Sequence, residues 1–435
     1  MLTTARTTAL TTQPPAKTPR TPVLRTRSTR TALTAVLATT ATLLAAPAAA
    51  ADPGSDQCTF SKTNHKYTGT PWALQRVNLD ELWSQSKGKG VEVAVIDTGV
   101  DTANPQLTKA VDASQGANYL PAKDDKGQPI DRGNAKGTTD TVGHGSRVAG
   151  IIAARPMKGT GFVGLAPEAT IIPMKQNDAE GHGTAATLAK AIRQAIRVKA
   201  DVINISQDTT KPIARDDDLQ RAVEEALGAG IVVVASAGND GLGGNVKKTY
   251  PASFEGVLAV AASDRNNERA AFSQSGDFVG VAAPGVDMIS TVPKGGHCSD
   301  NGTSFSAPYV AGVAALIKAK HRDWTPREIV AQIEQTAERS IPGHDRLVGW
   351  GVVDPVRALT EDDHPIESPR ADTGLTHAEA PTPARLTLGE TPQERTARIA
   401  TYVAIGVAVL VAGLGGGAVA LRDARRRRRA VSGRA

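Results

Sequence analysis

Short apolar runs alternate with longer amphipathic stretches between residues 91 and 359. The runs are rich in β-branched residues, as buried strands are, and the longer stretches place apolar residues three or four positions apart, as helices do. Six runs are expected to be strands: Val91–Ile96, Ala169–Pro173, Val202–Ser206, Ile231–Ala235, Val257–Ala262 and Val279–Ala282. This alternation predicts an α/β fold built from βαβ units around a mostly parallel sheet.

Two of the amphipathic stretches predict crossover helices between the strands. Thr187–Val198 and Asp218–Leu227 each place their larger apolar residues on one face. Asp216, Asp217 and Asp218 stand at the start of the second stretch, where negative charge suits the helix dipole. We therefore expect helices to flank the sheet.

The chain begins with the features of an export signal. Basic residues up to Arg30 precede the apolar run Ala32–Ala46, which ends in Pro47 and small residues. Residues 1–51 are therefore expected to be a signal peptide that is removed on export. The basic stretch before the apolar run is unusually long, which leaves open a start further along the chain. Residues 52–89 are then an N-terminal extension.

A second apolar segment, near the C-terminus, predicts a membrane anchor. Residues 360–398 are rich in Pro, Glu, Thr and Ala without periodicity and predict a linker. Residues 399–421 carry no charge and are long enough to cross a bilayer as a single helix. The tail at 422–435 contains five consecutive arginines, which favours a cytoplasmic tail and an outside position for the rest. Gly413 and Gly417 have the GxxxG spacing of packed membrane helices, although the Gly/Ala-rich composition favours chance.

The basic net charge follows from these two ends. The chain has a net charge of +6 and an isoelectric point near 9.3, values that ordinarily suggest nucleic acid or an anionic surface as a partner. The excess lies in the export signal and in the C-terminal tail, and the region between them is near neutral. We interpret the charge as targeting and topology, and we expect no nucleic-acid partner.

The only two cysteines, Cys58 and Cys298, both lie in the part expected to be exported. An even pair outside the cell favours a disulfide, and two unrelated buried thiols are the alternative. A bridge between them would hold the N-terminal extension beside the segment that leads to Ser304.

Two polar residues follow expected strands. Asp97 ends the first run and should emerge at the carboxyl edge of a central strand, where open α/β sheets build sites. Asp101 is a competing acid, but it lies past the turn and is expected to face solvent. Asn239 follows the fourth run to the same edge, where its amide could stabilise an oxyanion. A turn formed with Gly238 is the alternative for Asn239.

A histidine and a serine stand at the starts of expected helices. His144 lies between glycines before an apolar stretch, and a buried helix there would fix its imidazole. His182 has the same flanking glycines but precedes an amphipathic surface helix, which favours His144. Ser304 stands at a helix start, where unpaired N–H groups favour negative charge. With Asp97, these residues can form a charge relay in which the imidazole takes the hydroxyl proton and the carboxylate holds the tautomer.

Four segments resemble the signature motifs of the subtilase (S8) family of serine proteases. In chain order they are Asp97-Thr-Gly, Gly-His144-Gly, Ser236-Ala-Gly-Asn239 and Gly-Thr-Ser304-Phe-Ser-Ala-Pro. The match covers residues 90–359 and implies a subtilisin-like three-layer fold with a mostly parallel central sheet. It implies that Asp97, His144 and Ser304 are catalytic and that Asn239 completes the oxyanion hole.

The resemblance also implies which residues bind substrate. The sequence differs from the family motifs at one position. The resemblance implies that substrate binds at Ser206, Gln207, Ser236 and Gly238. Ser146 stands where the family usually has Thr. The hydroxyl is kept, so we expect little effect.

Within the family, the signal, short extension, linker, single apolar helix and basic tail are similar to those of the mycosins, which are associated with type VII secretion. The similarity implies a membrane-anchored endopeptidase that cleaves exported proteins outside the cell. Its partners would be protein substrates and membrane components of a type VII secretion complex. Two alternatives remain open: a structural cap of a secretion complex with a vestigial protease site, and a general secreted subtilase.

Two other kinds of site are disfavoured. Gly159–Gly164 satisfies the GxGxxG pattern, but a dinucleotide site needs a strand before it and a helix after it, and the expected order here is inverted. No cluster of Asp and Asn has the spacing of calcium ligands. We therefore expect no cofactor and no structural calcium.

Overall fold

A computed structural model describes residues 65–124, 126–179, 182–209, 217–244, 248–372 and 389–432. Its centre is a seven-stranded sheet in the order β2-β3-β1-β4-β5-β6-β7, and every pair in it is parallel. The strands are β1 Glu92–Asp97, β2 Ala117–Asn118, β3 Thr170–Lys175, β4 Val202–Ile205, β5 Val232–Ser236, β6 Leu258–Ser263 and β7 Val279–Pro284. The predicted subtilisin-like fold is confirmed.

All six expected strands are present within one or two residues of their expected bounds, and three further strands were not expected. These are β2 and the antiparallel pair β8 (Met288–Thr291) and β9 (His297–Asp300). β2 has two residues and the hairpin strands have four each, which is too short for a clear hydrophobic period.

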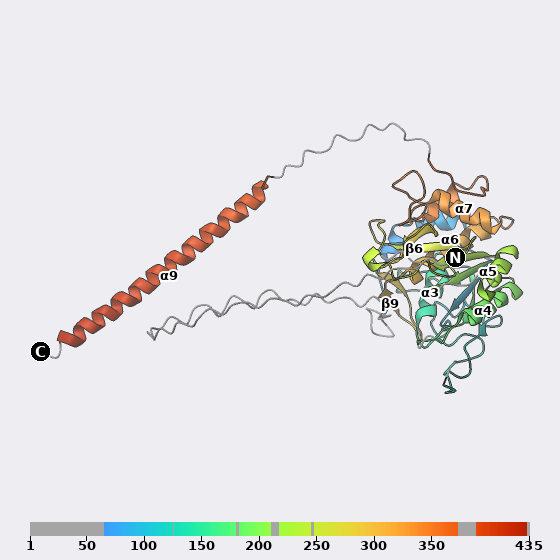
Figure 1. Ribbon diagram of the computed structural model, residues 1–435, viewed down its shortest axis with the longest axis horizontal. Helices are drawn as coiled ribbons and strands as arrows, with labels where there is room; N and C mark the ends of the chain where they lie inside the picture. The colour runs from blue at the N-terminus through green and yellow to red at the C-terminus, as the bar shows by residue number, and fades with distance from the viewer. Residues whose placement is uncertain are drawn as a thin grey trace, which may run out of the picture. The chain divides into compact units, whose positions relative to one another are not determined.

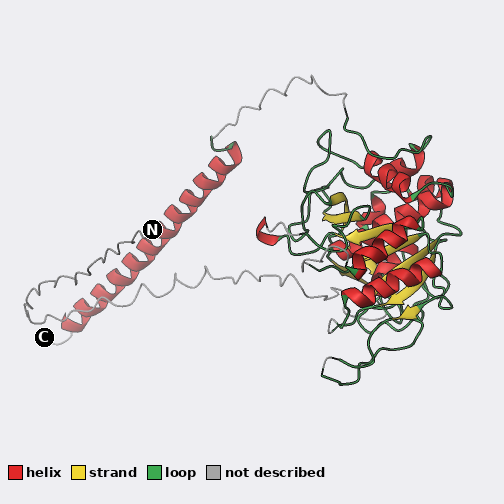
Figure 2. Cartoon of the chain, turned by 45° about the vertical axis from the view of Figure 1, so that its right-hand side comes forward, coloured by secondary structure: helices red, strands yellow, loops and turns green. Residues whose placement is uncertain are grey.

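Helices cover both faces of the sheet, which gives three layers (Figures 1 and 2). On one face lie α3 (His144–Ala153) and the long α6 (Thr303–Lys320), with α7 (Pro326–Thr336) and α8 (Pro355–Thr360) beyond them. On the other face lie α4 (Ala185–Arg197) and α5 (Asp218–Gly228), the two predicted crossover helices.

The central strand shows why the sequence reads as continuous apolar runs. Val93 and Val95 of β1 pack with α3 and α6, whereas Ala94 and Ile96 pack with α4 and α5. Because both faces of the strand are buried, no polar residue alternates with the apolar ones.

The end of the N-terminal extension packs against this core. Residues 65–89 contain α1 (Trp72–Gln75) and α2 (Leu79–Gln85), and Leu82 is fully buried. The amide of His297 donates to the carbonyl of His65 at 2.8 Å. Cys298, next in β9, is buried, and within the described residues there is no free thiol. Its predicted partner Cys58 and the predicted signal peptide lie outside the described residues, so the bridge stays a prediction.

The linker predicted over 360–398 is shorter at both ends. Asp362 is bound by Lys320 at 2.7 Å and by His321 at 2.6 Å, and the amide of Asp372 donates to Pro342, so the chain stays on the domain as far as Asp372. The last helix, α9 (Pro392–Ser432), begins seven residues before the predicted span.

Side-chain capping explains the early start of α9. The Thr391 hydroxyl accepts from the amide of Glu394, and the Glu394 carboxylate accepts from the Thr391 amide and hydroxyl. The apolar side chains of α9 from Ile399 to Leu421 are exposed, and its length and composition are sufficient to cross a membrane.

Close contact between α3 and the turn after β1 gives a prediction. A Cβ atom on Gly145 would collide with the backbone carbonyl oxygen of Gly99 and crowd Asp97. We expect Gly145→Ala to destabilise the chain by about 1–3 kcal/mol or more, because neither backbone can retreat. Urea unfolding of the full chain in detergent measures this. Gly228→Ala is the control: its new methyl meets no atom within 4 Å at the end of α5, and its stability should be unchanged or slightly higher.

Candidate active site

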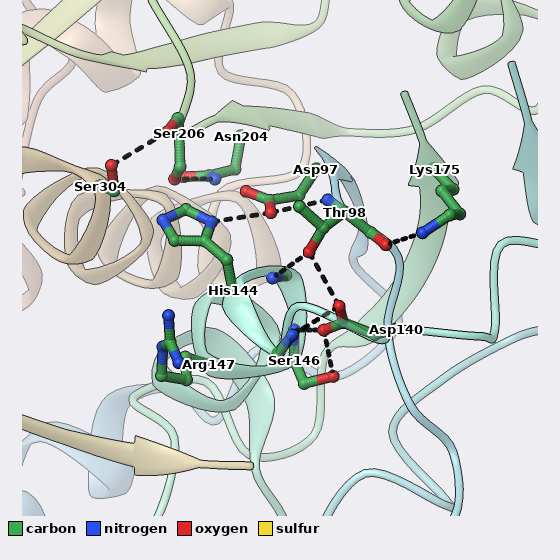
Figure 3. A network of polar contacts seen from close by, with 12 residues as sticks. Asp97, Thr98, Asp140, His144, Ser146, Arg147, Lys175, Asn204, Ser206 and Ser304 are labelled. Atoms are coloured by element: carbon green, nitrogen blue, oxygen red, sulfur yellow. Dashed lines mark hydrogen bonds and ion pairs between the residues drawn. The ribbon is translucent and has the colours of Figure 1, made fainter. Parts of the chain in front are cut away.

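The predicted catalytic residues meet at one edge of the sheet (Figure 3). β1, β4 and β5 are neighbours, and their carboxyl ends carry Asp97, Ser206 and Asn239 toward the same side. His144 is the first residue of α3, and Ser304 is the second residue of α6. Strands placed side by side in parallel therefore supply one half of the site, and two helix N-termini supply the other.

Asp97 and His144 form a short, buried contact. The distance from His144 Nδ1 to Asp97 Oδ1 is 2.7 Å, and the Thr98 amide donates to the same oxygen at 2.7 Å. Asp97 is fully buried, and 8 % of His144 is exposed. Since a carboxylate accepts hydrogen bonds, the proton of a neutral imidazole sits on Nδ1 and the lone pair on Nε2.

The Ser304 hydroxyl donates to the carbonyl oxygen of Ser206 at 3.0 Å. In the view of Figure 3 the His144 ring lies between Asp97 and Ser304. Ser304 is half-buried at the N-terminus of α6, where unpaired amides favour negative charge.

The side chain of Asn239 is held in one orientation. Its Oδ1 accepts from the amide and from the hydroxyl of Thr303, both at 3.0 Å. Because an amide N–H can only donate, the atom facing it must be the oxygen of Asn239, which leaves the NH₂ group to donate elsewhere. That nitrogen lies 3.7 Å from the position of a Cβ on Gly302, two residues before Ser304. An amide donor therefore lies close to the segment that carries Ser304.

Asp140 connects the turn after Asp97 to the start of α3, and the sequence analysis missed it. Its carboxylate accepts from the Thr98 hydroxyl at 2.9 Å, the Gly143 amide at 2.7 Å, and the amide and hydroxyl of Ser146 at 2.9 and 2.7 Å. The Ser146 hydroxyl also accepts from the Asp101 amide at 2.9 Å. The Ser146 hydroxyl, which stands where the family usually has Thr, thus both donates and accepts a hydrogen bond.

Lys175 supports the same turn from β3. Its ammonium group donates to the carbonyl of Thr98 at 2.5 Å, and its side chain is almost completely buried. Burial lowers the pKa of Lys175, and the negative charges of Asp140, Asp178 and Asp97 oppose that shift. A buried cation that holds the turn is thus balanced by carboxylates around it.

Arg147 lies behind the imidazole. It forms an ion pair with Asp300 at 3.4 Å, and its guanidinium lies 5.5 Å from the ring centroid of Phe305. The Phe305 ring lies 5.4 Å from that of His144. Phe305 thus packs against both side chains, which limits the movement of the His144 ring.

The alternatives considered from the sequence are placed elsewhere. His182 pairs with Asp178 at 2.6 Å. Asp101 accepts from the amides of Ala103 and Lys294 and makes no contact with His144. The glycine-rich segment Gly159–Gly164 follows α3 and precedes β3, the inverse of the order in a dinucleotide site.

Of the four residues predicted to bind substrate, one contacts Ser304 and one contacts its neighbour Thr303. Ser206 contacts the Ser304 hydroxyl, and Gln207 follows in the chain. The amide of Gly238 donates to the Thr303 hydroxyl at 3.2 Å. Ser236 is fully buried, so substrate contact at that residue stays a prediction. In the described part of the chain, no group of three or more His, Cys, Asp or Glu residues is arranged to hold a metal ion. The expected absence of a cofactor stays a prediction as well.

This arrangement is suited to acyl transfer. It combines a hydroxyl at a helix N-terminus, an imidazole whose free lone pair is set by a buried carboxylate, and an amide donor beside the hydroxyl.

Comparison with known proteins agrees with this chemistry. A family model described as "Subtilase family" matches residues 88–351. M-protease of Shouchella clausii (strain KSM-K16) is 37% identical over 284 residues, which cover 65% of this chain and 68% of that protein. The solved structure of the MycP3 protease from the type VII (ESX-3) secretion system is 32% identical, with a TM-score of 0.60, and the match covers 69% of this chain and 92% of that one. MycP1 from Mycobacterium smegmatis is 30% identical with a TM-score of 0.58, covering 76% and 91%.

The two Gly-His-Gly segments give a direct test. We expect His144→Ala to lower kcat/KM for peptide hydrolysis by about 10²–10⁴-fold, because the general base is lost. His182→Ala is the matched control, since it also breaks a His–Asp pair, and it should keep most of the activity. Loss of activity in His182→Ala with retention in His144→Ala would reverse the assignment.

Proposed function

We propose that this chain cleaves exported proteins at the outer face of the cell membrane, with Asp97, His144 and Ser304 as its charge relay. The chain belongs to the subtilase family and is a serine endopeptidase of the subtilisin type. The observation that carries the proposal is the 2.7 Å contact between His144 and the buried Asp97, beside the Ser304 hydroxyl.

The nucleophile in this proposal is the Ser304 oxygen. A rotation of its side chain moves the hydroxyl proton from the Ser206 carbonyl toward Nε2 of His144. As the oxygen attacks the scissile carbonyl carbon, the imidazole takes the proton and later gives it to the leaving amine. Asp97 keeps Nδ1 protonated and stabilises the imidazolium ion that forms. Water then repeats the sequence and releases the acyl group from Ser304.

The oxyanion is stabilised by the NH₂ group of Asn239 and by the amides at the start of α6. Thr303 holds Asn239 in place before substrate binds, so no reorganisation is needed when the charge develops. Loss of one such donor typically raises the barrier by about 2.7–4 kcal/mol.

The membrane location rests on the two ends of the chain. The predicted signal peptide, residues 1–51, would export the amino end, α9 would stop transfer, and the arginine cluster at 425–429 would stay in the cytoplasm. Residues 373–391 join the domain to α9, and a chain of that length extends to about 70 Å at most. The active site would therefore act on proteins close to the membrane surface.

Similarity to the MycP proteases supports a link to type VII secretion for this chain as well. We propose that proteins emerging from such a complex are its substrates and that membrane components of the complex are its partners. The alternative is a structural role with an inactive site.

A fluorophosphonate probe distinguishes the enzyme from an inactive cap. We expect the full-length chain in detergent to be labelled at Ser304, because the probe needs an activated serine. Ser304→Ala should remove the label, and His144→Ala should slow labelling strongly. A folded chain with Ser304 intact and unlabelled would contradict the charge relay.

Protease treatment of intact cells tests the topology. We expect it to remove the catalytic domain and leave a small basic membrane-bound fragment, because the domain faces outward. Lysed cells are the control, in which the C-terminal tail is digested too. A catalytic domain protected until lysis would exclude the proposed orientation.

A further inference from the structure

A pocket lies beside the candidate active site, past the end of β4. It has a volume of about 360 Å³, and its polar lining includes Asn177, Gln207, Asp208 and Thr209. Gln207 and Asp208 directly follow Ser206, whose carbonyl accepts from the Ser304 hydroxyl. Two residues that line the pocket therefore directly follow, in the chain, the residue that binds the Ser304 hydroxyl.

The backbone next to Asp208 is held at this pocket by hydrogen bonds. The next residue, Thr209, exchanges two backbone hydrogen bonds with Tyr250, at 3.1 and 3.0 Å. Oδ2 of Asp208 lies 2.9 Å from where a Cβ atom on Gly238 would be. Gly238 has a φ of +103° and precedes Asn239, so the carboxylate lies against the segment that carries the oxyanion donor. Glycine at this position leaves room for it.

Among the described residues, the carboxylate of Asp208 has no positively charged partner. Within the described residues it accepts no hydrogen bond and forms no ion pair, unlike Asp178, which pairs with His182, and Asp140, which accepts four hydrogen bonds. Its side chain is exposed to solvent. The surrounding protein and the negative charge of Asp240 nevertheless raise its pKa to about 6. A cation bound here would stabilise the ionised carboxylate against both the burial and the repulsion from Asp240.

We infer that Asp208, with Asp240 adding negative charge, selects a Lys or Arg side chain in the substrate residue whose carbonyl Ser304 attacks. The inference rests on the proposed function and specifies its substrate class.

The reach of the substrate side chain agrees with this assignment. Asp208 lies two residues beyond Ser206, so their Cα atoms are at most about 7 Å apart. The long stems of Lys and Arg cover such a distance and bring a cation to the carboxylate. An apolar side chain would remove water from Asp208 without providing a partner, and an acidic one would repel it.

Four matched peptides test the inference on the full-length chain in detergent. We would measure kcat/KM for succinyl-Ala-Ala-Pro-Xaa p-nitroanilides in which Xaa is Lys, Arg, Leu or Glu. We expect the wild-type chain to prefer Lys and Arg over Leu by about tenfold or more, with Glu poorest. Asp208→Asn removes the charge at constant shape and should lower the Lys/Leu and Arg/Leu ratios about tenfold. Asp240→Asn should lower them less.

Two controls make the outcome specific. The Leu peptide reports folding and catalysis within each variant, and its rate should not fall in Asp208→Asn. Asp363→Asn makes the same chemical change at an exposed carboxylate outside the pocket and should leave both ratios unchanged. No basic preference in the wild-type chain, or a preference that survives Asp208→Asn, would overturn the inference. Fluorophosphonate labelling reports the nucleophile separately, so a labelled chain without the preference contradicts only this inference.

Discussion

Parallel pairing of β1, β4 and β5 is the constraint on which the site depends. Parallel neighbours end on the same side, so the residues after their carboxyl ends are brought together although about 140 positions separate Asp97 from Asn239 in the chain. The two helices that start at this edge add groups of the other kind, an imidazole and a hydroxyl at N-termini. One sheet topology thus brings a carboxylate, an imidazole, a hydroxyl and an amide donor to the same edge of the sheet.

Burial of charge at this edge makes the supporting network necessary. Asp97 and Lys175 are almost completely buried, and an isolated charge in such a place is strongly unfavourable. Asp97 is therefore bound by His144 and the Thr98 amide, and Lys175 donates to the Thr98 carbonyl. Asp140 binds Thr98 from the other side. Because these bonds share Thr98, a change at any of them alters the position of the carboxylate that orients His144.

The parts of the fold that follow from local pattern were predictable from the sequence. Strands buried on both faces appear as apolar runs. The motifs that carry Asp97, His144, Asn239 and Ser304 could be recognised from the sequence alone, two after strands and two at helix starts. Asp140 could not be found in this way, because its hydrogen bonds join it to residues distant in sequence, such as Thr98. Asp208 could not be found either, because its place beside Gly238 follows from the fold. The early start of α9 depended on a reciprocal cap between Thr391 and Glu394, a local signal that the search for apolar residues overlooked.

A membrane tether and the charge at the active site would affect substrate selectivity in different ways. A domain joined by the nineteen residues 373–391 to a helix anchored in a membrane, as proposed for α9, would meet proteins that emerge nearby at a high effective concentration. Differences in binding affinity then separate substrates from other proteins poorly, because at high local concentration even weakly binding proteins occupy the active site. Discrimination has to come from the difference between transition states in the cleft. Among the described residues the Asp208 carboxylate has no ionic partner, and it lies two residues from Ser206, which contacts the Ser304 hydroxyl. The inferred preference would provide such a difference, since this carboxylate would favour a cationic substrate side chain and oppose an anionic one where the carbonyl is attacked. The same carboxylate would be of little use to an inactive scaffold, which has no need to distinguish one emerging side chain from another.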